Sequence, residues 1–462
     1  MNTQDTICAI ATAQGGAIGV IRISGKDAIA ITDRIFTPVG KHPLPLSERN
    51  TMAFGHIRQD DGEIIDEVLI GLFKSPHSYT GEDCVEISCH GSSFILQQVM
   101  QLLIRKGCRA AGPGEFTQRA FLNGKMDLSQ AEAVADLIAS SSAATHRMAM
   151  NQMRGGFSRE LSALRERLLH LTSLMELELD FSDHEELEFA DRSELETIAG
   201  DIEKVISGLV HSFSVGNVLK NGIPVAIVGE TNAGKSTLLN TLLNEEKAIV
   251  SDIHGTTRDV IEDTVNLSGI TFRFIDTAGI RDTHDTIENM GIARSFHKME
   301  QAEIVLWVVD NTCAEAQIRQ LSPRILPLCS NKQLIILLNK SDQVSAVPTK
   351  LSGLPENTVT LSISAKEKTG IQELQNLLVK TASVPELTSS DLIVTNVRHY
   401  EALSLALEDI HRVQNGLQTH LSGDFISQDL RECLFHLAEI VGGEITADEV
   451  LGNIFMKFCI GK

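Results

Sequence analysis

The chain has 462 residues, of which 42% are hydrophobic and 22% charged, and its net charge at pH 7 is −21. A chain of this length exceeds the size of one hydrophobic core, so we expect roughly two to four domains. The charge excludes bulk electrostatic binding to nucleic acid, because that binding requires lysine and arginine to neutralise phosphates. Most of the excess negative charge lies in residues 121–215 and 382–462. Any contact with RNA must therefore be local or shared with a basic partner.

No stretch of the sequence reaches the ~18 uncharged apolar residues that a membrane-spanning helix needs. The first residues include an acid in place of the basic start of a secretory signal. The eight cysteines are scattered and form no C-x-x-C pair, which is typical of reduced thiols and not of a disulfide framework or a zinc site. We expect a cytoplasmic protein with no membrane segment.

Residues 1–120 are predicted to form an α+β domain. Short β-like runs at 18–23, 67–73 and 84–89 alternate with turns. Residues 94–106 have apolar side chains at the three- and four-residue spacing of a helix.

Two segments, 121–215 and 382–462, have helical periodicity, and the first of them contains an acidic stretch at 180–191. The intervening residues 216–381 alternate strands with helices, which predicts a doubly wound α/β domain. Its five β-like runs are 225–228, 271–275, 304–309, 334–338 and 358–363. The order of segments suggests one helical domain into which the α/β domain is inserted, as surface loops tolerate.

Residues 229–237 fit the P-loop pattern G-x-x-x-x-G-K-[ST], and they follow a short apolar run and precede a helix-like segment. Glycines let the backbone turn around a polyphosphate so that N–H groups and the helix N-terminus point at its oxygens. Lys235 is predicted to contact the β- and γ-phosphates, and the Ser236 hydroxyl to bind Mg²⁺. The alternative is a plain glycine turn. The other residues predicted to line this site are Asn232, Ala233, Gly234 and Thr237.

The base is predicted to be guanine, so that the ligand is GTP or GDP. Asp342 follows Asn339 and Lys340 after a β-like run, and its carboxylate can accept two hydrogen bonds that guanine offers and adenine does not. Further support for the base is predicted from the backbone of Ser364, Ala365 and Lys366.

Two further segments are predicted to sense the γ-phosphate and its metal ion. In residues 255–259 Thr257 is expected to reach Mg²⁺. In the second segment an aspartate can hold the shell of the metal and a glycine N–H can contact the γ-phosphate. The residues of this second segment are Asp276, Thr277, Ala278 and Gly279.

The residue after Gly279 is Ile280, where signalling GTPases carry a glutamine that positions the attacking water. This chain must therefore activate water in another way. Glu288 is the best carboxylate candidate, with a solvated loop acid as the alternative. The Asn232 side-chain carbonyl could bind a monovalent cation beside the phosphates and supply the charge of an arginine finger.

Over essentially its whole length the chain resembles the MnmE (TrmE) family of tRNA-modification GTPases. Outside the nucleotide motifs the resemblance rests on residues 18–22, 80–83, 113–116, 120–133 and 459–462. It implies an N-terminal dimerising domain related to folate-binding proteins, a discontinuous helical domain and an inserted GTPase domain. It also implies a homodimer that forms a heterotetramer with the FAD-containing partner MnmG. Together they would install (carboxymethyl)aminomethyl groups at C5 of the wobble uridine of certain tRNAs.

The resemblance further implies a tetrahydrofolate, such as 5-formyl-tetrahydrofolate, as the one-carbon donor. By position, the folate contacts fall on Arg22, Glu82, Lys125 and Lys462. Cys459 would be a thiol at that pocket, with an inert packed cysteine as the alternative. The residues after it fit a prenylation box poorly.

In the GTPase domain the resemblance assigns K⁺ to Asn232 and to a loop that contributes Ser251, the Ile253 carbonyl and Thr256. Asp252, His254 and Gly255 belong to the same loop. Nucleotide-dependent pairing of two GTPase domains would order it and aim Glu288 at the water. Thr231 stands where proline is common in the family and Ser251 where threonine is frequent, which leaves the degree of K⁺ dependence open. The rival hypothesis is a GTPase switch in ribosome assembly without modification chemistry.

Overall fold

The structure is a computed structural model that describes residues 5–13, 15–39, 50–180, 192–246, 263–275, 299–330, 332–344, 354–355, 358–382, 392–443, 455, 458 and 461. The chain divides into two compact units. Unit 1 comprises Met1–Ala139, Ala149–Gly208 and Val397–Lys462, and unit 2 comprises Ser140–Met148 and Leu209–Asn396. No helix in the described ranges is long and apolar enough to cross a membrane.

Unit 1 begins with a seven-stranded sheet in the order β3-β4-β5-β6-β2-β1-β7. Alternate residues of its central strands face a core that also holds the buried side of α1 and α2, as the two-residue period of a half-covered sheet requires. The predicted α+β character is confirmed. The elements are β1 Ile7–Ile10, β2 Ile18–Ser24, α1 Ala28–Asp33, β3 Phe36–Pro38, β4 Thr51–Arg58, β5 Ile64–Phe73, β6 Cys84–His90, α2 Ser93–Arg105, β7 Arg109–Ala110 and α3 Glu115–Leu122.

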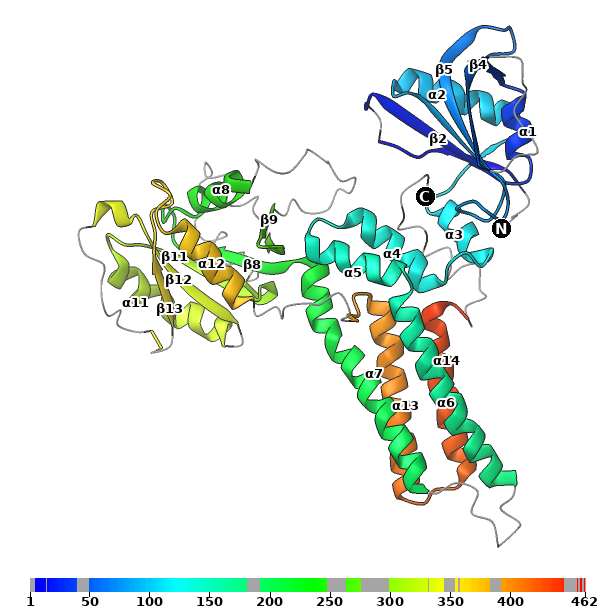
Figure 1. The fold of residues 1–462 in the computed structure, drawn as a ribbon. Helices are drawn as coiled ribbons and strands as arrows, with labels where there is room; N and C mark the ends of the chain where they lie inside the picture. The colour runs from blue at the N-terminus through cyan, green and yellow to red at the C-terminus, as the bar shows by residue number, and fades with distance from the viewer. Residues whose placement is uncertain are drawn as a thin grey trace. The chain divides into compact units, whose positions relative to one another are not determined.

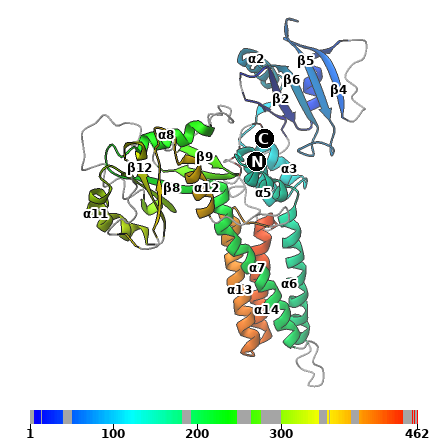
Figure 2. The same cartoon turned by 60° about the vertical axis from the view of Figure 1, so that its left-hand side comes forward.

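The described residues of the two predicted helical segments do form helices, and helices from the two segments share a bundle in unit 1 (Figure 1). In that bundle α13 packs along α14, and α6 packs on α14 (Figure 2). The buried side chains of α6 recur every three or four residues: Phe157, Leu161, Leu164, Leu168, Leu171 and Met175. The helices are α4 Leu128–Ala139, α5 Ala143–Met153, α6 Gly156–Asp180, α7 Arg192–Asn221, α13 Val397–Gln418 and α14 Gly423–Val441.

A buried ion pair joins the two sequence segments of this bundle. Glu132 on α4 accepts hydrogen bonds from Arg398 Nε and Nη2, both at 3.0 Å, and from His399 Nε2 at 2.7 Å. Arg398 also donates to the carbonyls of Glu439 and Ile440 at the end of α14, where a helix leaves its last carbonyls without partners. One guanidinium therefore holds α4, α13 and α14 together.

Unit 2 contains a six-stranded sheet in the order β13-β12-β11-β8-β10-β9, with helices and apolar cores on both faces. This confirms the predicted doubly wound α/β fold. The sequence predicted five strands, and the sixth, β9, is the antiparallel edge strand that pairs with β10. Its sequence Asp-Thr-Val-Asn-Leu has too few apolar residues to stand out. The elements are β8 Ile223–Val228, α8 Lys235–Glu246, β9 Asp263–Leu267, β10 Ile270–Phe274, β11 Ile304–Asp310, α11 Ala314–Ile325, β12 Gln333–Asn339, β13 Val359–Ser362 and α12 Ile371–Thr381.

Candidate nucleotide-binding site

The P-loop residues form a tight turn at the carboxyl end of β8, between that strand and α8. Gly229 has φ 149° and Gly234 has φ 98°, values that L side chains rarely adopt. A Cβ on Gly229 would lie 2.2 Å from the Val308 carbonyl oxygen, and one on Gly234 would lie 2.1 Å from Asn339 Nδ2. Both positions therefore exclude any side chain, which explains the spacing of the glycines in the motif.

Lys235 is the first residue of α8, and its side chain folds back over the loop. Its Nζ donates to the carbonyl oxygens of Gly229 at 2.9 Å and Glu230 at 2.6 Å. The first turn of α8 leaves backbone N–H groups without helical partners and carries the positive end of the helix dipole. Ser236 and Thr237 lie in this turn. The ammonium and the helix N-terminus together form a site for an anion such as a polyphosphate.

Asn339 ties the P-loop to the loop after β13. It is 3% exposed, its Nδ2 donates to the Ala233 carbonyl at 2.8 Å, and its Oδ1 accepts from the Ala365 N–H at 3.0 Å. Thr241 of α8 donates to the Ala365 carbonyl at 3.0 Å. Neutral hydrogen bonds therefore join the P-loop and α8, the end of β12 and the loop after β13, although these segments are far apart in the sequence.

Asp342 lies in a short 3₁₀ turn, Ser341–Gln343, and is exposed. The Ser364 hydroxyl donates to its Oδ1 at 2.6 Å, and Ser364 in turn accepts from the Glu367 N–H at 3.2 Å. The bond to Oδ1 thus orients the Asp342 carboxylate, and the exposed side chain can still accept hydrogen bonds from the N–H groups of a base. Lys366 is 79% exposed beside this loop.

Sequence reasoning missed a second link between the same loops. Lys340 Nζ lies 2.5 Å from Asp310 Oδ2 at the end of β11. Burial raises the pKa of Asp310, but hydrogen bonds from Lys340 and Thr312 outweigh it and hold the pKa below its usual value. The buried Gln317 accepts from the Asp310 N–H at 2.9 Å and donates to Glu230 Oε2 at 2.8 Å. An amide on a helix face carries no sequence signal for this role.

Many predicted residues of this site lie outside the described residues. They are Ser251, Asp252, Ile253, His254, Gly255, Thr256, Thr257, Asp276, Thr277, Ala278, Gly279 and Glu288. Asn232 is described: it is exposed at the tip of the P-loop with φ 66°. Among the predicted K⁺ ligands, only this one can therefore be located.

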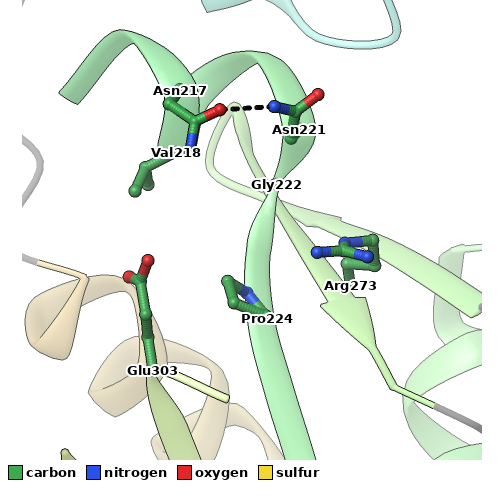
Figure 3. A pocket seen from close by; sticks show the side chains of 7 residues that line it. All are labelled: Asn217, Val218, Asn221, Gly222, Pro224, Arg273 and Glu303. Atoms are coloured by element: carbon green, nitrogen blue, oxygen red, sulfur yellow. Dashed lines mark hydrogen bonds between the residues drawn. The ribbon is translucent and has the colours of Figure 1, made fainter. Parts of the chain in front are cut away.

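A separate polar pocket of about 310 Å³ lies in unit 2 near the amino ends of β8 and β11 (Figure 3). There α7 ends, and Asn221 Nδ2 donates to Asn217 Oδ1 at 2.5 Å. Arg273 and Glu303 also line the pocket. Open α/β sheets bind their ligands at the carboxyl ends of the strands, where the P-loop is, so this pocket is not the nucleotide site.

Three of the predicted folate residues, Arg22, Glu82 and Lys125, lie among the described residues of unit 1. Arg22 pairs with Glu86, its Nε donating to Oε1 at 2.9 Å, and its Nη1 donates to the Gly461 carbonyl at 3.3 Å. Its guanidinium lies 5.3 Å from the centre of the Tyr79 ring and 5.8 Å from that of Phe116. Lys462 and Cys459 fall outside the described residues.

Glu82 is held by two groups from other segments. The Ser24 hydroxyl donates to its Oε2 at 2.6 Å, and Arg119 Nη1 lies 3.2 Å from the same oxygen. Arg119 is 3% exposed and also bonds to Asp5 and Glu115. Lys125 Nζ donates to the Pro76 carbonyl at 2.9 Å, and its chain passes beside Gly81. The sequence did not single out Arg119, because a charged residue on a short helix is usually at the surface.

Unit 2 has a doubly wound sheet with a P-loop after β8 and an Asn-Lys-Ser-Asp turn after β12. These features define unit 2 as a nucleotide-binding domain of the P-loop GTPase class. Two family models together match most of the chain. One described as "GTP-binding protein TrmE N-terminus" covers residues 6–125, and one described as "MnmE helical domain" covers residues 128–459. The chain belongs to the MnmE family, which confirms the resemblance found in the sequence.

Curated relatives match along the full chain, and each is named "tRNA modification GTPase MnmE". The protein of Bacteroides thetaiotaomicron is 66% identical, with 99% of this chain and 100% of the relative covered. That of Phocaeicola vulgatus is 62% identical, with 100% of each chain covered. That of Flavobacterium johnsoniae is 52% identical over the same shares.

Proposed function

We propose that this chain hydrolyses GTP and acts in tRNA modification. The observation that carries the proposal is the joining of three motif loops by Asn339 and Ser364, with Asp342 exposed beside them, in a chain 66% identical to a tRNA modification GTPase. Guanine supplies two donors to a carboxylate and adenine supplies none in that position, so ATP leaves the acceptor unpaired.

The phosphates are proposed to lie in the P-loop. Lys235 exchanges its bonds to the Gly229 and Glu230 carbonyls for phosphate oxygens, which accept more strongly because they are charged. The hydroxyl of Ser236, in the first turn of α8, suits Mg²⁺, which prefers oxygen ligands. When bound, Mg²⁺ neutralises the charge that develops on the transferred phosphoryl group. Thr257 is proposed as its second protein ligand, and Asp276 and Gly279 as its neighbours.

K⁺ stimulation is a finer part of the proposal. Asn232 extends from a left-handed turn at the tip of the P-loop, and a side-chain carbonyl there suits a monovalent cation. Its proposed co-ligands are Ser251, the Ile253 carbonyl and Thr256, and Glu288 is proposed to orient the water. Hydrolysis is expected to be faster in KCl than in NaCl at equal ionic strength; equal rates would remove the cation role of Asn232.

The one-carbon donor is proposed to be a tetrahydrofolate bound near Arg22 and Glu82. The contact of Arg22 with the Gly461 carbonyl supports a role for the next residue, Lys462, because it ties the end of the chain to that arginine. Lys125 and the Cys459 thiol complete the proposed set. Labelled 5-formyl-tetrahydrofolate should bind the wild type and bind Arg22→Gln more weakly. Absence of binding to the wild type would remove folate from the proposal.

We also propose that the chain is a homodimer and works with the flavoprotein MnmG. In unit 1 the outer face of the N-terminal sheet carries exposed apolar side chains: Phe54 and Leu69 are paired across β4 and β5, and they are 50% and 39% exposed. Met52, on the same face, is 67% exposed. Exposed apolar side chains grouped on a sheet face suit self-association. Phe54→Glu should yield monomers in sedimentation, whereas Glu67→Gln, a polar change on the same strand face, should not.

The deciding experiment uses cells that lack this chain. Their tRNA should lack the (carboxymethyl)aminomethyl group on wobble uridine, and wild type but not Lys235→Ala should restore it. Purified wild type should hydrolyse GTP and not ATP. Normal wobble nucleosides together with a ribosome-assembly defect would replace the proposal with the rival switch function.

A further inference from the structure

The arginines of the helical part of unit 1 fall into two groups. Every arginine of α13 and α14 has an acidic partner: Arg398 pairs with Glu132, Arg412 with Asp409 and Arg431 with Glu176. Between the end of α5 and the middle of α6 the situation is different. Four arginines there are exposed and form no ion pair with any residue that the structure describes: Arg154, Arg159, Arg165 and Arg167.

The four arginines surround the outward side of α6. The apolar stripe of this helix, from Phe157 to Met175, faces the bundle. At 100° per residue Arg159 lies near the middle of the opposite side, and Arg165 and Arg167 lie on the two sides of the stripe. Arg159 and Arg167 are separated by about 12 Å along the axis. Arg154 precedes α6 at the turn, where its carbonyl accepts a bond from Arg159 Nη1 at 3.0 Å.

The position of α6 leaves this side accessible within unit 1. In Figures 1 and 2, α6 forms an outer edge of the bundle that it shares with α13 and α14. The arginine side chains are long, and guanidinium groups held at the surface keep their donors in water. Two glutamates, Glu160 and Glu166, lie in the same stretch of sequence, so residues 154–167 carry four positive and two negative charges.

These charges stand out because the chain as a whole is acidic, with a net charge of −21. Such a chain repels a polyanion over most of its surface, so an RNA is directed to places where positive charge is exposed. Unpaired arginines are suited to phosphates, since the planar guanidinium donates two parallel hydrogen bonds to one anion. Contacts of this kind position a nucleic acid without reading its sequence.

We propose that the α6 arginine surface, formed by Arg154, Arg159, Arg165 and Arg167, binds the phosphate backbone of the RNA substrate. The inference rests on the proposed function in that it takes this RNA to be tRNA, and it names where the RNA docks. The surface holds the RNA by shape and charge. Selection of the target uridine belongs to other parts of the protein.

The test compares wild type with a variant in which all four arginines are glutamine. Binding of an unmodified tRNA transcript is measured between about 50 and 200 mM salt. The variant should bind at least about tenfold more weakly at low salt, and the slope of log K against log[salt] should fall by about 3 if each arginine contacts one phosphate. Replacing the four arginines with lysine should restore most of the affinity and the slope, because the charges return.

A matched pair of single changes separates docking from general loss of charge. Arg159→Gln should weaken binding, whereas Arg431→Gln, an exposed arginine that pairs with Glu176, should change it little. GTP hydrolysis without RNA and the thermal unfolding midpoint should be the same in all variants, because none of these residues lies in the nucleotide site or the core.

Unchanged tRNA affinity and salt slope in the glutamine variant would overturn the inference while leaving the proposed function intact. Retained tRNA binding with lost binding of the flavoprotein partner would also overturn it, and would make this a protein-docking surface. A wild type that hydrolyses GTP but binds no tRNA would contradict the proposed function itself, and the inference with it.

Discussion

In unit 2 the loops of the nucleotide site are joined mainly by neutral hydrogen bonds, whereas distant segments of unit 1 are joined by buried ion pairs. Asn339 and Thr241 make the first kind of link, because their partners are backbone groups. Arg119 and Glu132 make the second kind. The pair Lys340–Asp310 is the exception in unit 2.

The difference follows from what each site has to do. In a site for a polyphosphate the cation must be able to exchange its partners for the ligand, as the carbonyl partners of Lys235 allow, so neutral amides and hydroxyls are suited to hold the loops around it. Segments that must stay together permanently can use charges, since a buried charge that loses its partner destabilises the fold strongly. Changes in unit 2 should therefore alter ligand binding, and changes in the ion pairs of unit 1 should alter stability.

The largest effect is expected for the base-recognising carboxylate. Asp342→Asn should weaken GTP binding by a factor on the order of 10⁴, because the amide cannot accept both of the hydrogen bonds that guanine donates. Xanthosine triphosphate should then bind better than GTP, because its second carbonyl accepts from the new amide. Nucleotide affinities measured by titration check this. Parallel loss of both nucleotides would contradict the role given to Asp342.

Arg119→Met should cost about 3 kcal/mol of unfolding free energy, because it leaves the carboxylate of Glu82 without its arginine. Asp5 and Glu115 keep their pairs with the half-exposed Arg109. Urea unfolding followed by circular dichroism measures it. GTP affinity should not change. Lys366→Met serves as the control, because Lys366 is 79% exposed and its pair with Glu367 is worth little. An equal loss in both variants would remove the contrast between the two units.

The ion pair of Glu132 predicts a dependence of stability on pH. Burial raises the pKa of this carboxyl, but the bonds from His399 and Arg398 outweigh burial and lower the pKa from 4.5 to about 2. The contribution is therefore complete above pH 4.5 and is lost as pH falls from there toward 2, on the order of 3 kcal/mol.

Glu132→Gln should remove that part of the pH dependence and lower stability at neutral pH. The urea midpoint is measured at several pH values for both proteins. Glu176→Gln, which alters a partly exposed pair with Arg431, should follow the wild-type profile. A wild-type profile that is flat between pH 5 and 3 would argue against the ion pair as the link between α4 and α13.

The smallest effect is expected for Thr241→Val, which keeps the shape of the side chain and removes the hydroxyl that lies 2.8 Å from the Thr237 carbonyl and 3.0 Å from the Ala365 carbonyl. A neutral bond of this kind contributes about 1 kcal/mol, so GTP should bind about fivefold more weakly. Thr197→Val on α7, which loses only an exposed bond within its own helix, should bind GTP as the wild type does. Titration of both variants resolves the difference.

The success of sequence reasoning differed between the same two regions. The P-loop and the turn around Asp342 were predicted because each is a short contiguous motif whose residue spacing already fixes the backbone. The antiparallel strand β9 was missed, since an edge strand needs little apolar sequence. The cluster around Arg119 was missed as well, because its partners are up to 114 residues away.

By itself the sequence determined the fold classes, the family and the chemistry expected of residues 229–237 and 339–342, because glycines, lysine and carboxylate act there through local geometry. Only the tertiary structure decided which charges are neutralised: Arg119 is buried among three carboxylates, Arg398 closes the end of α14, and the arginines of α6 keep no partner among the described residues. The physical reason is that an ion pair depends on where the folded chain brings two distant side chains, and their order along the sequence does not contain that distance.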